Sequence, residues 1–218
     1  MNTAPKADAA AAVSVRAFLA LDVAPHIQTA LVELKRELAT AGAAVRWVRD
    51  DGLHATVKFL GSVDPAVLEA VRAALGDGLQ LFPVFSVQVG GLGVFPNLRR
   101  PQVVWIGLAA REVAELAARV DAAAAAFGFA AESRPFQPHI TLGRVNSPRG
   151  WPRLEERLKA HWGDDFGTCE IDELIGYRSD LRRDGAVYTR LWTIPLLRRR
   201  GGAHGTGPES GAGARFGG

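Results

Sequence analysis

The same order of predicted strands and helices occurs twice along this sequence, and that repetition restricts the fold more than any other feature. Each half begins with an apolar strand, continues with an amphipathic helix, a second strand and a second helix, and ends with a further strand. Strands and helices that alternate in this way indicate the α+β class. We therefore expect two pseudo-symmetric lobes, each a small antiparallel sheet with helices outside, around a central cleft.

Local signals set the expected limits of the elements in the first half. The strands are expected at 15–21, 54–60 and 85–89, with a turn at Gly61. Proline suits the first turn of a helix, and glycine often follows the last. The two helices are therefore expected to run from Pro25 to Gly42, and from Pro65 to Gly76 and Gly78.

The second half repeats this order and adds a hairpin. Strands are expected at 103–108, 139–145, 169–175 and 187–194, and helices from Val113 to near Gly128 and over 151–162. The dipeptide Asp184-Gly185 is typical of a tight hairpin turn, so it predicts that the chain turns back there into its last strand.

The composition is that of an ordinary globular chain, with 48% hydrophobic and 22% charged residues among 218. A net charge of +3 permits a polyanionic partner without requiring one. Residues 1–13 are expected to be a disordered lead-in, and the Gly-rich residues 199–218 a flexible tail. A single bilobal domain is therefore expected at 14–198.

Cys169 is the only cysteine, which excludes both an internal disulfide and a cysteine-rich zinc site. The N-terminal residues lack the basic and apolar regions of a secretory signal, and no apolar run is long enough to cross a bilayer. We expect a monomeric, cytoplasmic protein that does not bind a membrane.

Each half carries a His-x-Thr motif on its second predicted strand. The two copies are His54-Ala55-Thr56-Val57 and His139-Ile140-Thr141-Leu142. Residues i and i+2 of a strand face the same side, so each lobe presents an imidazole and a hydroxyl together. The alternate residues are expected to face the core: Ala55, Val57, Phe59, Ile140 and Leu142. If the lobes pack about a pseudo-twofold axis, both motifs meet in one cleft.

Two histidines in one cleft suit the cleavage of a phosphodiester by concerted acid–base catalysis. A neutral imidazole takes a proton from water while an imidazolium gives one to the departing ribose oxygen, since both forms exist near neutral pH. Thr56 and Thr141 can donate hydrogen bonds to the phosphate oxygens. A single histidine on a strand is more often structural, but two matched copies favour catalysis.

A metal site at the motifs is less well supported by the sequence. Zinc usually takes Cys, Asp or Glu ligands beside two histidines, and neither the His54 motif nor the His139 motif contains one. We therefore expect no metal and no other cofactor.

Five stretches of the chain resemble the RNA 2',3'-cyclic phosphodiesterases, also called the 2'-5' RNA ligase family, within the two-histidine (2H) phosphoesterases. They are RAFLALDV (16–23), VRWVRDDGLHATVKFLGSV (45–63), GGLGVFPNLRRPQVVWIGL (90–108), RPFQPHITLGRV (134–145), and YRSDL with DGAVYT near the C-terminal end (177–189). They span nearly all of the expected domain, and both histidine motifs match the family pattern.

The resemblance implies a bilobal α+β fold and the hydrolysis of RNA 2',3'-cyclic phosphate ends to 2'-phosphomonoesters. It also implies that His54 is the proton donor and His139 the proton acceptor. A 2'-5' RNA ligase activity is a further expectation. The expected partners are RNA ends that bear a 2',3'-cyclic phosphate, tRNA fragments included.

Three arginines near the motifs are candidates for binding the phosphate. Arg134 and Arg144 flank the second motif and Arg46 precedes the first. A guanidinium group matches two phosphate oxygens. Arg134 and Arg144 are equally explained as solvated charges at strand ends, and for Arg46 that explanation is favoured.

Four aromatic residues are candidates for stacking on a base. They are Phe95, Phe136, Tyr177 and Trp47. Aromatic residues in such positions more often belong to a core, so both explanations stay open.

Two other functions also stay open. A sister phosphoesterase that acts on ADP-ribose cyclic phosphate or on a 2'-5' linkage would use the same pair of histidines. A non-catalytic module that binds RNA ends would be favoured by the loss of a His or Thr from one motif, but both motifs are intact.

Overall fold

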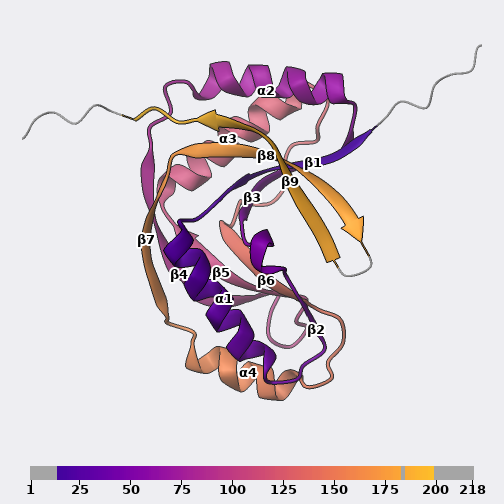
Figure 1. Ribbon diagram of the computed structural model, residues 1–218, viewed down its shortest axis with the longest axis vertical. Helices are drawn as coiled ribbons and strands as arrows, with labels where there is room; N and C mark the ends of the chain where they lie inside the picture. The colour runs from indigo at the N-terminus through magenta and orange to yellow at the C-terminus, as the bar shows by residue number, and fades with distance from the viewer. Residues whose placement is uncertain (1–13, 183–184, 199–218) are drawn as a thin grey trace, which may run out of the picture.

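A computed structural model describes residues 14–182 and 185–198 (Figure 1). The lead-in predicted at 1–13, the tail predicted at 199–218 and Asp184 of the predicted turn lie outside the described residues. Within the described part of the chain, no helix is long and apolar enough to cross a membrane.

Nine strands of the described chain form one sheet, and four α-helices cover it. The strands are β1 (Val15–Leu21), β2 (Val45–Trp47), β3 (Ala55–Val63), β4 (Phe85–Phe95), β5 (Val103–Ala109), β6 (His139–Val145), β7 (Asp165–Ile171), β8 (Glu173–Arg182) and β9 (Gly185–Pro195). The helices are α1 (Pro25–Ala39), α2 (Pro65–Leu79), α3 (Arg111–Ala125) and α4 (Trp151–Ala160), with a short 3-10 helix, η1, at Asp50–Gly52.

The strand order is β7-β4-β5-β6-β3-β1-β8-β9, with β2 paired to β6, and all of these pairs are antiparallel. The sheet narrows at β3 and β6, which are joined by one residue pair, Ala55 with Ile140. This narrow junction divides the sheet into a first lobe (β3, β1, β8, β9) and a second lobe (β6, β5, β4, β7, with β2). The predicted α+β class and bilobal arrangement are confirmed.

The two lobes are not the two halves of the chain. β4 ends the first half but pairs with β5 in the second lobe, and β8 belongs to the second half but pairs with β1 in the first lobe. Each half therefore completes the sheet of the other lobe. This exchange ties the lobes together and holds the motif-bearing strands, β3 and β6, side by side.

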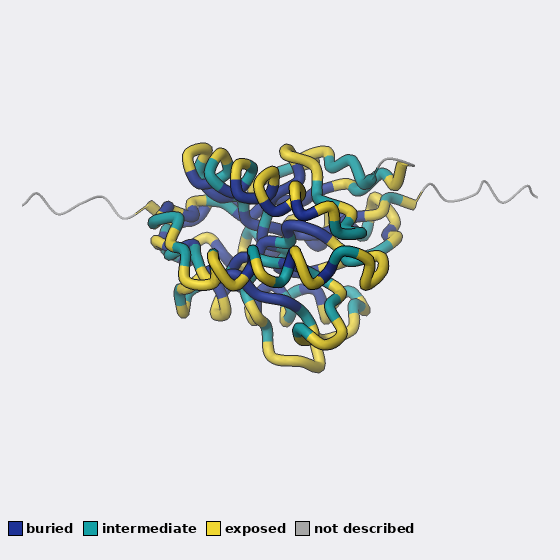
Figure 2. The backbone as a smooth tube through the Cα atoms, turned by 90° about the horizontal axis from the view of Figure 1, so that it is seen from below, coloured by how far each residue is buried: buried dark blue, intermediate teal, exposed yellow. Residues whose placement is uncertain are grey.

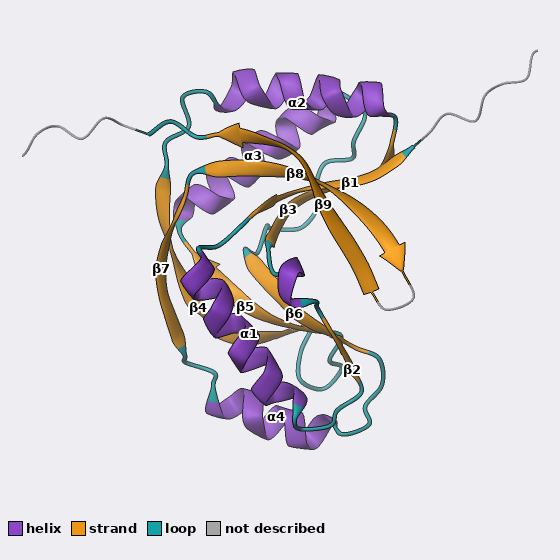
Figure 3. Cartoon of the chain, in the orientation of Figure 1, coloured by secondary structure: helices purple, strands orange, loops and turns teal. Residues whose placement is uncertain are grey.

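The helices pack in two pairs at opposite ends of the molecule (Figure 3). α2 and α3 contact each other and lie over the first lobe, while α1 and α4 contact each other beside β7. Apolar residues at helical spacing bury one face of each helix, as Ile27, Leu31 and Leu38 do in α1. Figure 2 shows the buried backbone in the middle of the molecule and the exposed residues on the outer turns.

Several expected limits are wrong. Gly76 and Gly78 do not end the second helix, which continues to Leu79. A glycine inside a helix costs about 1 kcal/mol, but Leu75 and Leu79 are each 1% exposed, and their burial outweighs that cost.

Three further elements also differ from the expectation. α4 ends at Ala160, before the predicted end at 162. The strand expected at 169–175 is two strands, β7 and β8, which separate at Asp172. The short β2 is an edge strand that the apolar pattern does not reveal.

Candidate active site

A cleft of about 1190 Å³ between the lobes is lined by both His-x-Thr motifs. The structure thus brings His54, Thr56, His139 and Thr141 together, although they come from opposite halves of the chain. The alternate positions of the second motif, Ile140 and Leu142, are fully buried on the other face of the sheet. Most other predicted site residues also line the cleft: Arg46, Trp47, Phe95, Arg134, Phe136 and Arg144.

His54 lies directly before β3 and is enclosed by aromatic rings. Its ring stacks on Phe18 with the centroids 4.8 Å apart, and the Tyr188 ring meets it edge-on at 5.0 Å. Removing the imidazole from water disfavours its charged form. Burial therefore lowers the pKa of His54 to about 4.

His139 is the first residue of β6 and is held by a hydrogen bond. Its Nδ1 lies 2.8 Å from the carbonyl oxygen of Gln137, which fits an Nδ1–H that donates to that carbonyl. Phe95 meets the imidazole edge-on at 5.0 Å. Burial lowers the pKa of His139, and the nearby Arg144 lowers it further, while the bond to Gln137 acts in the opposite direction.

The bond to Gln137 has a chemical consequence for His139. With Nδ1 carrying the proton, Nε2 is the ring nitrogen that keeps its lone pair. No described residue bonds to Nε2, and the cleft lies in front of the ring. His139 is therefore arranged as a proton acceptor.

Tyr177 is the predicted site residue that does not line the cleft. It is 8% exposed and stacks beneath Phe18, with the ring centroids 5.2 Å apart. Its hydroxyl donates a 2.7 Å hydrogen bond to Asp22, and burial raises the pKa of both groups. Its position fits a support behind Phe18 and His54, not a surface on which a base stacks.

Phe59 is expected in the core, and this expectation is wrong. Its side chain is 61% exposed and lines the cleft. The register between β1 and β3 shifts between the Leu19–Lys58 and Ala20–Thr56 pairs, so Val57 is an extra residue in β3. Such a bulge reverses the alternation of side chains beyond it, and Phe59 therefore faces the cleft beside Phe18.

The same bulge turns Lys58 away from the cleft and toward α3. Its side chain is 3% exposed, and Nζ pairs with Asp121 at 2.5 Å and donates to the Ala130 carbonyl at 2.6 Å. The chain that follows Ala130 leads to Arg134 and Phe136 in the cleft. A buried lysine thus anchors the segment that carries two predicted site residues. No sequence motif indicates this role of Lys58.

The cleft is strongly cationic. Its lining holds six arginines and one carboxylate, Glu132. The arginines are Arg16, Arg46, Arg49, Arg134, Arg144 and Arg182. The sequence did not single out Arg16, Arg49 or Arg182. Arg16 and Arg182 lie far from both motifs along the chain, whereas Arg49 lies between Arg46 and His54 and proximity to the motif could have indicated it. A cleft with low-dielectric walls and an excess of positive charge attracts anions.

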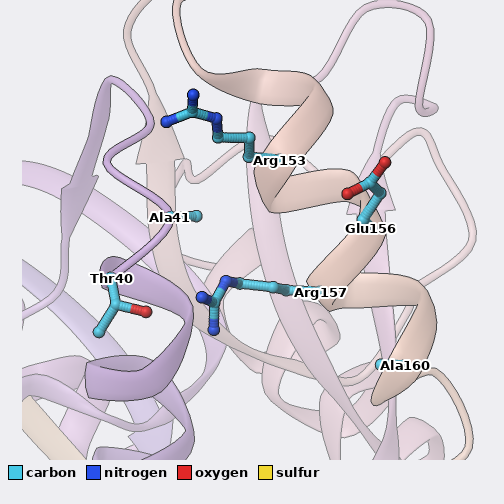
Figure 4. A pocket seen from close by; sticks show the side chains of 6 residues that line it. All are labelled: Thr40, Ala41, Arg153, Glu156, Arg157 and Ala160. Carbon is cyan, nitrogen blue, oxygen red and sulfur yellow. The ribbon is translucent and has the colours of Figure 1, made fainter.

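A second cavity, of about 490 Å³, lies between the end of α1 and α4 (Figure 4). Its lining includes Thr40, Arg153, Glu156 and Arg157, and neither histidine motif contributes to it. Arg157 pairs with Glu37 across the two helices at 3.7 Å. This depression belongs to the contact between the helices.

Among the described residues, no group of three or more His, Cys, Asp or Glu side chains is placed to hold a metal ion. The guanidinium groups and hydroxyls of the cleft can donate hydrogen bonds to an anion, and its imidazoles can exchange protons with one.

Comparisons with known proteins agree with this geometry. The profile of the family described as LigT like Phosphoesterase matches residues 21–105 and 106–188, one match for each half. A protein of Methanothermobacter thermautotrophicus named RNA 2',3'-cyclic phosphodiesterase is 33% identical over 84% of this chain and all of its own length. A protein of Aeropyrum pernix with the same name is 32% identical over 75% of this chain and 93% of its own.

Solved structures show the same fold. A Thermus thermophilus protein superposes with a TM-score of 0.71 at 28% identity, over 83% of this chain and 97% of its own. E. coli LigT in complex with 3'-AMP superposes with a TM-score of 0.67 at 27% identity, over 84% of this chain and 99% of its own.

Proposed function

Because the chain belongs to the LigT-like phosphoesterase family, we propose that it hydrolyses the 2',3'-cyclic phosphate at RNA ends to a 2'-phosphomonoester. The observation that carries this proposal is the placement of two His-x-Thr motifs, one from each lobe, in a single cationic cleft. The curated names of the relatives support RNA as the substrate class.

In the proposed reaction, the phosphorus lies between the two imidazoles. His139 Nε2 takes a proton from water, the water oxygen forms a bond to phosphorus, and the bond from phosphorus to the ribose O3' breaks. His54 gives its proton to the departing O3', so the product carries a 2'-phosphate and a free 3' hydroxyl. If the 5' hydroxyl of a second RNA takes the place of water, the same step forms a 2'-5' bond.

The other residues of the cleft would hold the phosphate and the nucleoside. Thr56 and Thr141 would donate hydrogen bonds to the non-bridging oxygens as charge develops on them. Arg46, Arg134 and Arg144 would supply positive charge around the same oxygens. Phe95, Phe136 and Trp47 offer ring surfaces for a base.

The protonation state of His54 supports a role as proton donor that depends on the presence of the substrate. A pKa of about 4 leaves the imidazole neutral at pH 7 in the empty cleft. A bound phosphate diester carries a negative charge, which favours the imidazolium and raises that pKa. His54 would therefore become an acid only when the anion is in place.

The test is incubation with an oligonucleotide that ends in a 2',3'-cyclic phosphate, in the presence of EDTA because no proposed step uses a metal. We expect a new end that releases no phosphate to a phosphatase specific for 3'-phosphates. Release of phosphate by that enzyme would show a 3'-phosphate and contradict the roles of the histidines. Binding without turnover would favour an RNA-end binding module, and faster turnover of ADP-ribose cyclic phosphate would favour the sister activity.

A further inference from the structure

The lining of the cleft continues beyond the histidines to residues of the β8–β9 hairpin. This hairpin projects from the sheet (Figure 1). The lining there comes from three neighbouring strands of the first lobe and includes Arg16, Phe59, Ser179, Leu181 and Arg182. Tyr188 connects this end to His54, because its ring contacts both His54 and Phe18. We call this part of the cleft the hairpin end.

The hairpin end exposes large apolar side chains. Phe59 is 61% exposed and Leu181 is 72% exposed, whereas Phe18, which lies beside Phe59, is 2% exposed. Exposed apolar groups that line a cleft, flanked by polar residues, are typical of a binding surface. An aromatic face of this kind accepts any base, since every base has a π-face.

Two arginines flank these apolar groups. Neither Arg16 nor Arg182 forms an ion pair with any described residue, whereas Arg178 of β8 and Arg190 of β9 are paired with carboxylates. Arg16 lies two positions before Phe18 in β1, about 7 Å further from His54 along the strand. Unpaired guanidinium groups beside an aromatic face suit a phosphodiester linkage next to a base.

The proposed chemistry sets the direction in which RNA leaves the reaction centre. The departing O3' faces His54 in the first lobe, and the attacking water lies on the side of His139 in the second. The ribose is attached to the departing oxygen, so it lies on the side of the first lobe. The RNA chain that precedes it is attached to that ribose through the 5' carbon, and the hairpin end is the continuation of the cleft in the first lobe.

We propose that the hairpin end binds the nucleotide that precedes the cyclic phosphate terminus, with its base on Phe59 and Leu181 and its linking phosphate beside Arg16 and Arg182. This assignment rests on the proposed function. It makes an oligonucleotide, and not a mononucleotide, the preferred substrate.

The test compares kcat/KM for a trinucleotide that ends in a 2',3'-cyclic phosphate with kcat/KM for a nucleoside 2',3'-cyclic phosphate. We expect the wild-type protein to prefer the trinucleotide by at least tenfold. Phe59→Ala should reduce that preference roughly tenfold by raising KM for the trinucleotide, because the stacking of one base contributes about a tenfold gain in affinity. Arg16→Gln should reduce it as well, and more strongly at low salt.

Two matched variants serve as controls. Leu191→Ala removes an apolar side chain, 39% exposed in β9, that does not line the cleft, and Arg153→Gln removes a distant arginine that pairs with no described residue. Neither should change the preference. The nucleoside substrate should keep its kcat in these two controls, and far-UV circular dichroism should show that all four variants fold.

The outcomes separate the two proposals. If the wild-type protein hydrolyses neither substrate, the proposed function fails. If it hydrolyses both but Phe59→Ala and Arg16→Gln leave the preference intact, the assignment of the hairpin end is wrong. An equal loss on both substrates would place Phe59 at the terminal nucleoside and overturn the assignment as well.

Discussion

Ala55 lies opposite Ile140 where β3 meets β6, and this pair joins the two lobes. In antiparallel pairing, the residue before one partner faces the residue after the other. One further step of the register on either side therefore places His54 opposite Thr141 and His139 opposite Thr56. All four side chains line the cleft, so each lobe contributes one imidazole and one hydroxyl next to this junction. The symmetry of the cleft follows from this single contact.

The two histidines of the cleft lead to the first prediction. His54→Ala and His139→Ala should each reduce kcat/KM by roughly 10²–10⁴-fold, because each removes one proton-transfer group. Steady-state kinetics on a cyclic-phosphate oligonucleotide measures the loss. His26→Ala, at the exposed start of α1, is the matched control and should keep full activity. Near-normal turnover in either motif variant would refute the mechanism.

The hydroxyls of the two motifs give the second prediction. Thr56→Ala and Thr141→Ala should cost less than the histidine variants, about tenfold to a hundredfold in kcat/KM, since each removes one hydrogen-bond donor. Thr→Ser at the same positions keeps the hydroxyl and should restore most of the rate. If serine and alanine were equally impaired, packing of the threonine methyl group would explain the effect and the phosphate contact would not.

The pKa values of the two histidines give the third prediction. His54 must be protonated and His139 neutral, and burial lowers the pKa of both, that of His54 to about 4. A group with a lowered pKa loses its proton at a lower pH. As the pH rises, the protonated form of His54 is therefore lost first, and kcat/KM begins to fall at a low pH. The optimum of kcat/KM, which reports the free protein, should therefore lie below pH 6.5.

The profile of kcat reports the complex and should differ in a defined direction. The bound phosphate raises the pKa of His54, so the fall of kcat at high pH should come at a higher pH than the fall of kcat/KM. Both profiles come from initial rates between pH 4 and 9. Profiles whose high-pH limbs coincide would show that the phosphate does not act on this imidazole.

The sequence predicts the motifs well because their geometry is local. Two side chains that are two residues apart on a strand face the same side of the sheet, whichever strands are its neighbours. Thr56 and Thr141 accordingly lie in the cleft with their histidines. The paired occurrence of the motif also predicts that they meet, since a repeat folds twice in the same way.

The features that could not be predicted depend on contacts between distant parts of the chain. The bulge at Val57 arises from the pairing of β3 with β1, so neither the exposure of Phe59 nor the burial of Lys58 follows from alternation. The exchange of β4 and β8 between lobes leaves no local signal. Arg16 and Arg182 reach the cleft only because β1 and β8 are neighbours in the sheet.

Lys58 gives the last prediction, because it links the fold to the cleft. Its Nζ holds Asp121 of α3 and the Ala130 carbonyl, and the next residues carry Arg134 and Phe136 into the cleft. Lys58→Met keeps the approximate length of the side chain but removes the ammonium group that donates to both partners, so that among the described residues Asp121 keeps only the backbone N–H of Glu132 as a donor. Unfolding in urea should show a loss of about 2 kcal/mol, in the range measured for hydrogen bonds to charged groups. Hydrogen exchange should rise in residues 130–137. KM should increase more than kcat falls, because Arg134 and Phe136 of this segment would bind the substrate but transfer no proton.

Lys159→Met, which removes an exposed lysine paired with Glu155 on α4, is the control and should change stability by less than about 0.5 kcal/mol. A Lys58→Met protein with normal exchange in that segment but impaired kinetics would show that Lys58 acts on the cleft by another route.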